Sequence, residues 1–286
     1  MRLGENNHKR PQGSHKIHYI KNFELNLNSF LLSVDFFSNF VCEAHLCHGI
    51  QVSPTEMVGS RRVFIFEIKF LIMERSVVYF CPRINADNLV RVYKALGREA
   101  KGRVAAKLST GEAGNPNHLS TDVIKKLIKL TDAVIVECNT AYEGKRCNAA
   151  DHLQTAAEHG FTAIAEVDIM DADGEIALPV SNGKHLKENY VGKNWRNYDF
   201  TMVLSHFKGH PMGGFGGALK NVAIGMASSA GKAWIHTAGK SKDVPVDWEN
   251  VPPQEDFLES MAEACESVFN VAGNNILYTL VSLKKC

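Results

Sequence analysis

Residues 199–221 read DFTMVLSHFKGHPMGGFGGALKN, and this stretch decides the fold class. Its first part, Asp199–His206, has the apolar centre that is typical of a strand buried on both faces of a sheet. Five glycines then fall within nine positions, and Gly216–Met226 has the pattern of a helix. We therefore predict that a buried strand leads through a glycine-rich turn, Ser205–Asn221, into a helix.

Strand-like and helix-like segments alternate on either side of this stretch. The pattern predicts strands at Val77–Phe80, Arg103–Leu108, Ala133–Cys138 and Ile276–Val281, and helices at Asp87–Ala100, after Ser120, at Asn148–His159 and at Gln254–Val271. Two more strands, Phe161–Ile169 and Glu175–Val180, are expected to pair as a hairpin through Asp171–Gly174. This alternation predicts an α/β fold with a mixed, mostly parallel sheet and helices on both faces.

The first 72 residues differ in pattern from the rest of the chain. They mix polar, basic and aromatic residues without a clean period, whereas Met73 opens a short charged lead and a strand. We expect residues 1–72 to be a non-native or poorly ordered extension and residues 73–286 to form a single α/β domain that begins at a natural Met73. The alternative is a genuine extension that packs on this domain.

The composition of the chain indicates which partners and which cellular compartment to expect. The net charge is +1 and the pI is near 7.7, so no nucleic-acid or membrane partner is expected from overall charge. Seven cysteines at irregular spacing, with no secretory signal, favour reduced thiols in a cytoplasmic protein. The Cys/His cluster at Cys42–His48 has no second ligand pair at zinc-finger spacing, and we expect no metal site.

The glycine-rich turn has the composition of an anion site. Backbone N–H groups of glycines at the start of a helix can approach an anion closely, and the helix dipole favours it there. Lys208 and Lys220 supply positive charge, while His206 and His210 titrate near neutrality. The alternative is a structural turn with solvated lysines and histidines.

Two familiar nucleotide-binding loops do not fit the turn. Lys220 stands between Leu219 and Asn221, whereas the nucleoside-triphosphate loop needs Gly-Lys followed by Ser or Thr. The dinucleotide fingerprint needs a small residue where Leu219 stands. The sequence therefore does not indicate ATP or NAD.

Three other segments carry candidate groups. Lys107–Glu112 and Glu137–Arg146 each follow a predicted strand, and we expect Lys107 and Glu137 to converge on the glycine-rich turn. Trp234–Lys240 adds His236 and Lys240. For each segment, an ordinary polar loop is the alternative.

The turn resembles a known family. His206-Phe-Lys208-Gly-His210, followed by Gly216-Gly-Ala-Leu-Lys220-Asn221 and Gly225, is similar to the Lys-x-His…Leu-Lys-Asn…Gly signature of the domain of unknown function 362 family. The resemblance runs from about Met73 to Tyr278. It includes Lys107–Gly111, Glu137–Gly144, His152–Gly160 and Trp234–Lys240.

The resemblance carries implications for cofactors and for the end of the chain. Members of the family are often described as iron–sulfur or ferredoxin-like proteins, because many have a cysteine-rich cluster segment. That implies a cluster and a redox partner in full-length relatives, but this chain has no Cys-x-x-Cys pair to supply the ligands. The family also implies further strands after Tyr278, so we expect a C-terminal truncation.

A more remote likeness is to the N-terminal domain of nickel-dependent lactate racemases. Carried over, it implies an acid/base role for His206 and a carboxylate-binding role for Lys220. Fold-level likeness of this kind does not by itself transfer function.

Three hypotheses for function follow. The first is a small-molecule enzyme, or its remnant, that binds a small anionic molecule, a carboxylate or a phosphate. The others are an electron-transfer protein with its cluster segment missing, and a non-catalytic metal- or ligand-binding protein that uses histidines. The candidate catalytic residues are His206, His210 and Glu137. The candidate substrate-binding residues are Lys107, Lys208, Gly213, Gly214, Gly216, Gly217, Lys220, Asn221, His236 and Lys240.

Overall fold

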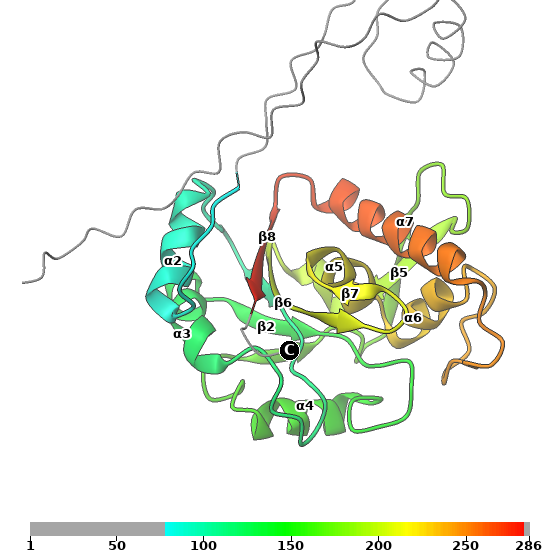
Figure 1. Ribbon diagram of the computed structural model, residues 1–286, viewed down its shortest axis with the longest axis horizontal. Helices are drawn as coiled ribbons and strands as arrows, with labels where there is room; N and C mark the ends of the chain where they lie inside the picture. The colour runs from blue at the N-terminus through cyan, green and yellow to red at the C-terminus, as the bar shows by residue number, and fades with distance from the viewer. Residues whose placement is uncertain (1–77, 283–286) are drawn as a thin grey trace, which may run out of the picture. The chain divides into compact units, whose positions relative to one another are not determined.

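Parallel strands in the order β3-β2-β1-β6-β8 form the centre of residues 78–282, the part of the chain that the computed structural model describes (Figure 1). Their bounds are β1 Val104–Lys107, β2 Val134–Glu137, β3 Val167–Ile169, β6 Phe200–His210 and β8 Ile276–Ser282. A short strand, β7 (Gly214–Gly216), pairs antiparallel with the far end of β6.

This strand order creates a switch point between β1 and β6. From β1 the chain builds outward through β2 and β3 on one side, and it then returns to place β6 and β8 on the other side. In open α/β sheets, ligands bind in the crevice outside the carboxyl ends of the strands at such a point.

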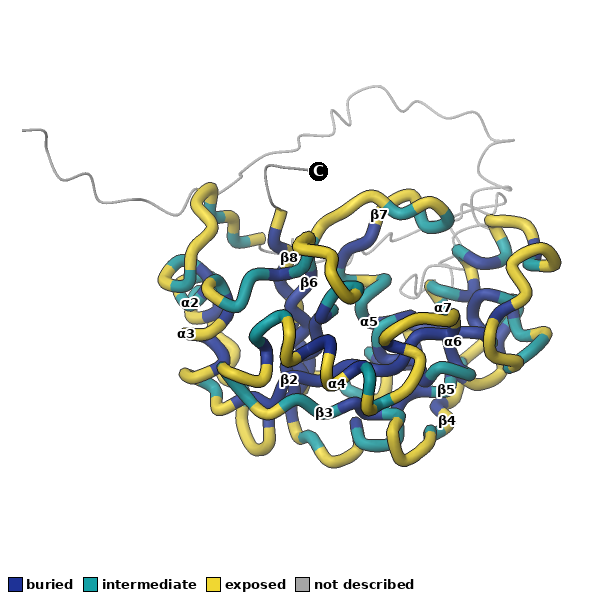
Figure 2. Tube along the Cα trace, turned by 90° about the horizontal axis from the view of Figure 1, so that it is seen from below, coloured by how far each residue is buried: buried dark blue, intermediate teal, exposed yellow. Residues whose placement is uncertain are grey.

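Helices cover both faces of the sheet, as the alternating pattern predicts. The helices are α2 Ala86–Ala95, α3 Thr121–Thr131, α4 Ala149–Glu158, α5 Ala218–Met226, α6 Ser229–His236 and α7 Gln254–Ala272, with a 3-10 turn, η1, at Lys193–Asn197. Because side chains alternate along a strand, Ala105 of β1 joins the core under α5 to α7, while Ala106 joins the core under α2 to α4. Strands at the centre are accordingly buried (Figure 2). The predicted α/β class is confirmed.

The predicted hairpin through Asp171–Gly174 is wrong. β3 pairs in parallel with β2, whereas β4 (Glu175–Pro179) leaves the main sheet and pairs antiparallel with β5 (Glu188–Gly192). The Asp171 carboxylate accepts hydrogen bonds from the backbone N–H groups of Asn139 and Ser229. These bonds hold the end of β3 at the sheet edge, so the chain turns away rather than back along β3.

The glycine-rich stretch is also built differently from the prediction. β6 runs on to His210, reverses at the tip and returns as β7, and only then does α5 begin at Ala218. Gly214 takes a positive φ of 70° in this hairpin, a conformation that favours glycine. The rings of Phe207 and Phe215 pack across the hairpin in a tilted arrangement, with centroids 5.5 Å apart. The stretch is therefore a β-hairpin arm followed by a helix, not a direct strand-to-helix turn.

Smaller differences concern the ends of elements. Val78 and Tyr79 lie outside any strand and Phe80 forms only a single bridge, so the described part of the strand predicted at 77–80 is reduced to one bridge residue. Helix α2 ends at Ala95 rather than Ala100, close to Gly97, which has a φ of 64°. Ser120 is the N-cap residue of α3 but its side chain makes no capping bond. The predictions for residues 1–72 fall outside the described residues.

Candidate functional site

Lys107 ends β1 at the switch point and is fully buried. Its ammonium donates hydrogen bonds to the Leu108 carbonyl oxygen (2.7 Å) and to Asn221 Oδ1 (2.9 Å). The Asn221 amide in turn donates to Ser205 Oγ at 3.1 Å, so a buried polar chain links β1, α5 and β6. Burial lowers the pKa of Lys107 to about 8, even though the nearby Glu137 carboxylate raises it.

Lys220 lies in the first turn of α5 and is half-buried. Within residues 78–282 its ammonium has neither a hydrogen bond nor an ion pair. Burial lowers the pKa of Lys220 to about 8, and the positive charges of Lys208, Lys232 and Lys107 lower it further. The charged groups that lower it most strongly are all cations, the fourth being Arg146. The surroundings of Lys220 are thus predominantly positive, and within the described residues no carboxylate pairs with it directly.

Lys232 of α6 belongs to the same group of cations but was not predicted from the sequence. It is 7% exposed, and its ammonium donates to the carbonyl oxygens of Ala227 (2.6 Å) and Cys138 (3.4 Å). A signal was present, because Lys232 is the one charged residue in the small and apolar segment 227–235. A lone lysine in such a segment is expected to be buried and to need a specific partner.

Two histidines with opposite hydrogen bonds face this group. His210 Nδ1 accepts from the Gly213 N–H at 3.0 Å, whereas His236 Nδ1 donates to the Lys232 carbonyl oxygen at 2.7 Å. Burial, together with the charge of Lys220, lowers the pKa of each histidine to about 4. Both rings are therefore neutral at pH 7.

Glu137 lies on the other face of the sheet and does not converge with Lys107 on the glycine-rich stretch. Lys107 pairs in register with Val136, so the next residue, Glu137, points to the opposite side, toward α4. Its carboxylate is fully engaged by Thr110, by Arg146 Nη1 (3.0 Å) and by His152 Nε2 (3.1 Å). The predicted convergence of Lys107 and Glu137 is wrong, because it ignored the two-residue period of a strand.

The groups that bind the Glu137 carboxylate also keep it ionised. Burial alone would raise the pKa of Glu137, but the charges of Arg146 and His152 outweigh it and hold the pKa well below its ordinary value. Arg146 also bonds Glu112, so it ties the loop after β2 to the loop after β1. These contacts indicate a structural role for Glu137.

The remaining predicted side chains lie around the hairpin arm and beyond α6. His206 alternates with Ser205 and therefore faces the α2–α4 side, where its Nε2 atom is buried without a partner. Burial, followed by the charge of Lys208, lowers the pKa of His206. Lys208 is exposed on the arm, and Lys240 is exposed after α6.

The four glycines divide into two pairs. Gly213 and Gly214 form the tip of the hairpin, where the Gly213 N–H is already bonded to His210. Gly216 pairs with Lys208 across the arm, and Gly217 is the N-cap residue of α5. Only the second pair lies beside Lys220 at the start of the helix, so the predicted cradle of four glycine N–H groups does not form.

A hollow of about 860 Å³ lies at the opposite edge of the sheet, beside Arg103 and the first residues of β2. Several lysines line it, but Lys126 is paired with Asp87 at 2.6 Å and Lys125 with Asp122 at 2.6 Å. Lys125 and Lys126 therefore already have counter-ions, and Lys129, which has none among the described residues, is exposed, so the hollow offers no half-buried unpaired cation like Lys220.

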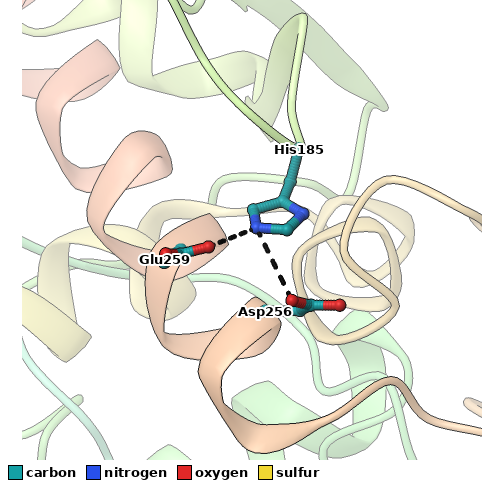
Figure 3. Close-up of side chains that lie close together, drawn as sticks. All are labelled: His185, Asp256 and Glu259. Atoms are coloured by element: carbon teal, nitrogen blue, oxygen red, sulfur yellow. Dashed lines mark hydrogen bonds and ion pairs between the residues drawn. The ribbon is translucent and has the colours of Figure 1, made fainter.

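His185, Asp256 and Glu259 lie close together on the β4–β5 loop and α7, with their ligand atoms within 4.8 Å of one another (Figure 3). His185 Nε2 is 2.6 Å from Glu259 and 3.9 Å from Asp256. The Lys184 ammonium already contacts Glu259 at 2.7 Å. This arrangement joins the loop to α7 through ion pairs, and nothing in it calls for a metal.

Together, the fold and the lysines at the carboxyl ends of β1 and β6 define an α/β protein with a cationic site at a topological switch point. The family described as domain of unknown function (DUF362) matches residues 104–283, and the chain belongs to this family, as its Lys-x-His…Leu-Lys-Asn motif predicts. No curated protein matches the chain. None of the helices in the described residues is long and apolar enough to span a bilayer.

Two solved structures match part of the chain. A Thermotoga maritima protein from a structural genomics consortium is 13% identical, with a TM-score of 0.42, over 70% of this chain and 51% of its own. The lactate racemase apoprotein from Thermoanaerobacterium thermosaccharolyticum is 15% identical, with a TM-score of 0.41, over 72% of this chain and 54% of its own. The chain spans about half the length of each. The second of these structures is a lactate racemase, the group to which the remote sequence likeness pointed.

Proposed function

We propose that this DUF362 protein is a small-molecule enzyme whose substrate is a small anion, a carboxylate or a phosphate, bound at the carboxyl edge of β1 and β6. The main support is that the half-buried Lys220 ammonium has no hydrogen-bond or ion-pair partner among the described residues and that the charges acting on it most strongly are cations. Removing a charge from water without a partner is costly, so such an arrangement is better explained by a ligand than by stability.

The lysines have separate roles in this proposal. Lys220 contacts the anion directly, because its half-buried ammonium donates no hydrogen bond within the described residues, unlike those of Lys107 and Lys232. Lys107 and Lys232 are anchored by hydrogen bonds to carbonyl and amide oxygens. Their charges make the electrostatic potential of the site positive, and this potential is larger where water is excluded. Asn221 positions Lys107, and its own amide is taken up by the protein. Negative charge that develops in a reaction would be stabilised by these fixed cations.

Proton transfer falls to His210 and His236 in place of the predicted His206 and Glu137. Both rings are neutral at pH 7 and both lie within the field of Lys220. A neutral imidazole accepts a proton through its lone pair as a general base, and its N–H can act as a weak acid toward developing negative charge. Lys208 of the exposed arm adds charge at the entrance to the site.

The other two hypotheses stay predictions. For an iron–sulfur or metal role, the described thiols are of two kinds: Cys138 and Cys265 are buried, and burial raises the pKa of each to about 12, whereas Cys81 is half-buried and Cys147 is exposed. Thiolates, not thiols, are the ligands of such centres.

Thermal unfolding of the full chain with sulfate, phosphate and malonate tests the proposed site. We expect each anion that binds to raise the unfolding temperature with concentration, as binding to the folded state requires. The shift should be lost in Lys220→Met and kept in Lys129→Met, which removes an exposed lysine from the hollow at the opposite edge. Equal shifts in the two variants would overturn the site.

A further inference from the structure

We propose that His236 and His210 are an acid–base pair with fixed, opposite tautomers, in which His236 Nε2 accepts a proton from the substrate while His210 Nε2–H donates one. The inference deepens the proposed function and rests on it, because the anion bound by Lys220 is the substrate on which the pair acts.

The tautomer of His236 is set by a backbone oxygen. Its Nδ1 atom lies 2.7 Å from the carbonyl oxygen of Lys232, one helical turn earlier in α6. A carbonyl oxygen can only accept, so the proton of the neutral ring is on Nδ1 and the lone pair is on Nε2. The ring is held in place by stacking on Phe257 at 4.8 Å and by the edge of Trp248 at 5.3 Å.

The tautomer of His210 is set in the opposite sense. Its Nδ1 atom lies 3.0 Å from the backbone nitrogen of Gly213, at the tip of the hairpin arm. A backbone N–H can only donate, so the lone pair is on Nδ1 and the proton of the neutral ring is on Nε2. At the Nε2 atom, His236 therefore presents a lone pair and His210 presents an N–H group.

The first turn of α7 brings the two histidines to the same site. Gln254 donates to the carbonyl oxygen of Met212, beside His210, at 2.7 Å, and Phe257, three residues later, stacks on His236. Residues three apart share one face of a helix. The charge of Lys220 also lowers the pKa of both histidines, in keeping with these contacts.

The chemistry that fits this pair is proton relocation on a carboxylate with an acidic C–H beside a carbonyl. The C–H bond breaks, its proton goes to His236 Nε2, and its electron pair forms the new C=C bond of an enolate held by the lysines. The proton of His210 Nε2 then adds to a second atom of the substrate, so the net charge of the substrate is unchanged, and His210 is left as an imidazolate in the field of the Lys220 ammonium. Solvent returns a proton to His210 and removes one from His236. No oxidant or reductant is needed, and the class of reaction is an isomerisation or tautomerisation.

Long-range proton–nitrogen NMR of the full chain with ¹⁵N-histidine tests the pair at pH 7. We expect the His236 signal to report a protonated Nδ1 and the His210 signal a protonated Nε2. His236→Asn and His210→Gln assign the two signals, and sequential backbone assignment gives the same information if a variant does not fold. The same tautomer for both histidines, or an imidazolium for either, would overturn the pair.

Sulfate added to the same sample separates this inference from the proposed function. If sulfate raises the unfolding temperature and raises the pH at which both histidines titrate, the pair lies at the anion site. If sulfate raises the unfolding temperature but leaves either histidine unchanged, the anion site stands and the pair is overturned. If sulfate does not bind while the opposite tautomers are seen, the tautomers stand, the substrate role of the pair is overturned and the proposed function fails.

Discussion

The ammonium nitrogen of Lys107 lies 2.7 Å from the point where a Cβ atom on Gly225 would stand. The same point is 2.7 Å from Asn221 Oδ1, the atom that accepts the hydrogen bond of Lys107. The missing side chain at residue 225 thus lets α5 pack closely against the end of β1, with a lysine buried between them. This relationship gives the glycine of the family signature a physical role.

Gly225→Ala should therefore destabilise the protein. Alanine improves helix propensity by about 1 kcal/mol, but we expect a net loss of about 1–3 kcal/mol because the new methyl group overpacks a buried polar contact. Urea unfolding of the parent and the variant measures this loss of stability. The control is Gly209→Ala, where a Cβ would meet nothing within 4 Å. A Gly225→Ala protein that is as stable as the parent would refute the close approach.

Alkaline pH should stabilise the parent relative to Lys220→Met. The pKa of Lys220 is about 8 in the folded protein, against 10.5 ordinarily. The unfolded chain therefore binds more protons between pH 8 and pH 10.5, so the stability contributed by this group rises through that window. Subtracting the variant's unfolding free energy from that of the parent at each pH isolates this contribution. A difference that does not change with pH would contradict the lowered pKa.

Anion affinity should fall as pH rises through about 8. Only the protonated Lys220 attracts an anion, and its pKa of about 8 places the loss of charge there. Sulfate is the suitable probe because its charge does not change in this range. Calorimetric titrations at pH 6.5 and pH 9.5 measure the two affinities. Equal affinities would show that another group holds the anion.

Arg146→Met should lower the free energy of unfolding much more than the removal of an exposed charge does. It leaves the buried Glu137 carboxylate without its guanidinium partner, for which a loss of about 3–5 kcal/mol is expected. The control is Arg103→Met, whose pair with Glu166 is exposed and 3.7 Å long, with an expected loss of about 0–1 kcal/mol.

The same network sets the acid sensitivity of the fold. Because the folded pKa of Glu137 lies well below its ordinary value, its contribution is present above pH 4.5 and is lost as pH falls through the folded pKa. Acid unfolding of Arg146→Met should begin at a higher pH than in the parent. Identical acid transitions in the two proteins would argue against a buried, charged Glu137.

The sequence predicted the sheet well because its strands and helices carry clear periods. The apolar runs around β1, β2 and β6 and the amphipathic pattern of α7 were placed within a few residues. The hairpin arm was missed because glycines in a tight turn and glycines in an anion loop have the same composition. Only the register, with Lys208 opposite Gly216, distinguishes them.

The site was predicted in part for a similar reason. Lys107 and Lys220 were expected at one edge because both follow strands that meet there. The face to which a side chain points depends on strand register, so Glu137 and His206 were grouped with residues on the opposite face. Lys232 lies far along the chain on α6, and only tertiary packing brings it to Cys138 and the end of β2.

The most direct test of the account is a calorimetric titration of the full chain with sulfate at pH 6.5, alongside Lys220→Met and Lys129→Met. The account predicts saturable binding in the parent and in Lys129→Met, and a loss of about 1.5–3 kcal/mol of binding free energy in Lys220→Met, the range for a hydrogen bond to a charged group. Folding of Lys220→Met should be unchanged or slightly improved. Equal binding by all three proteins, or unfolding of Lys220→Met, would contradict the account.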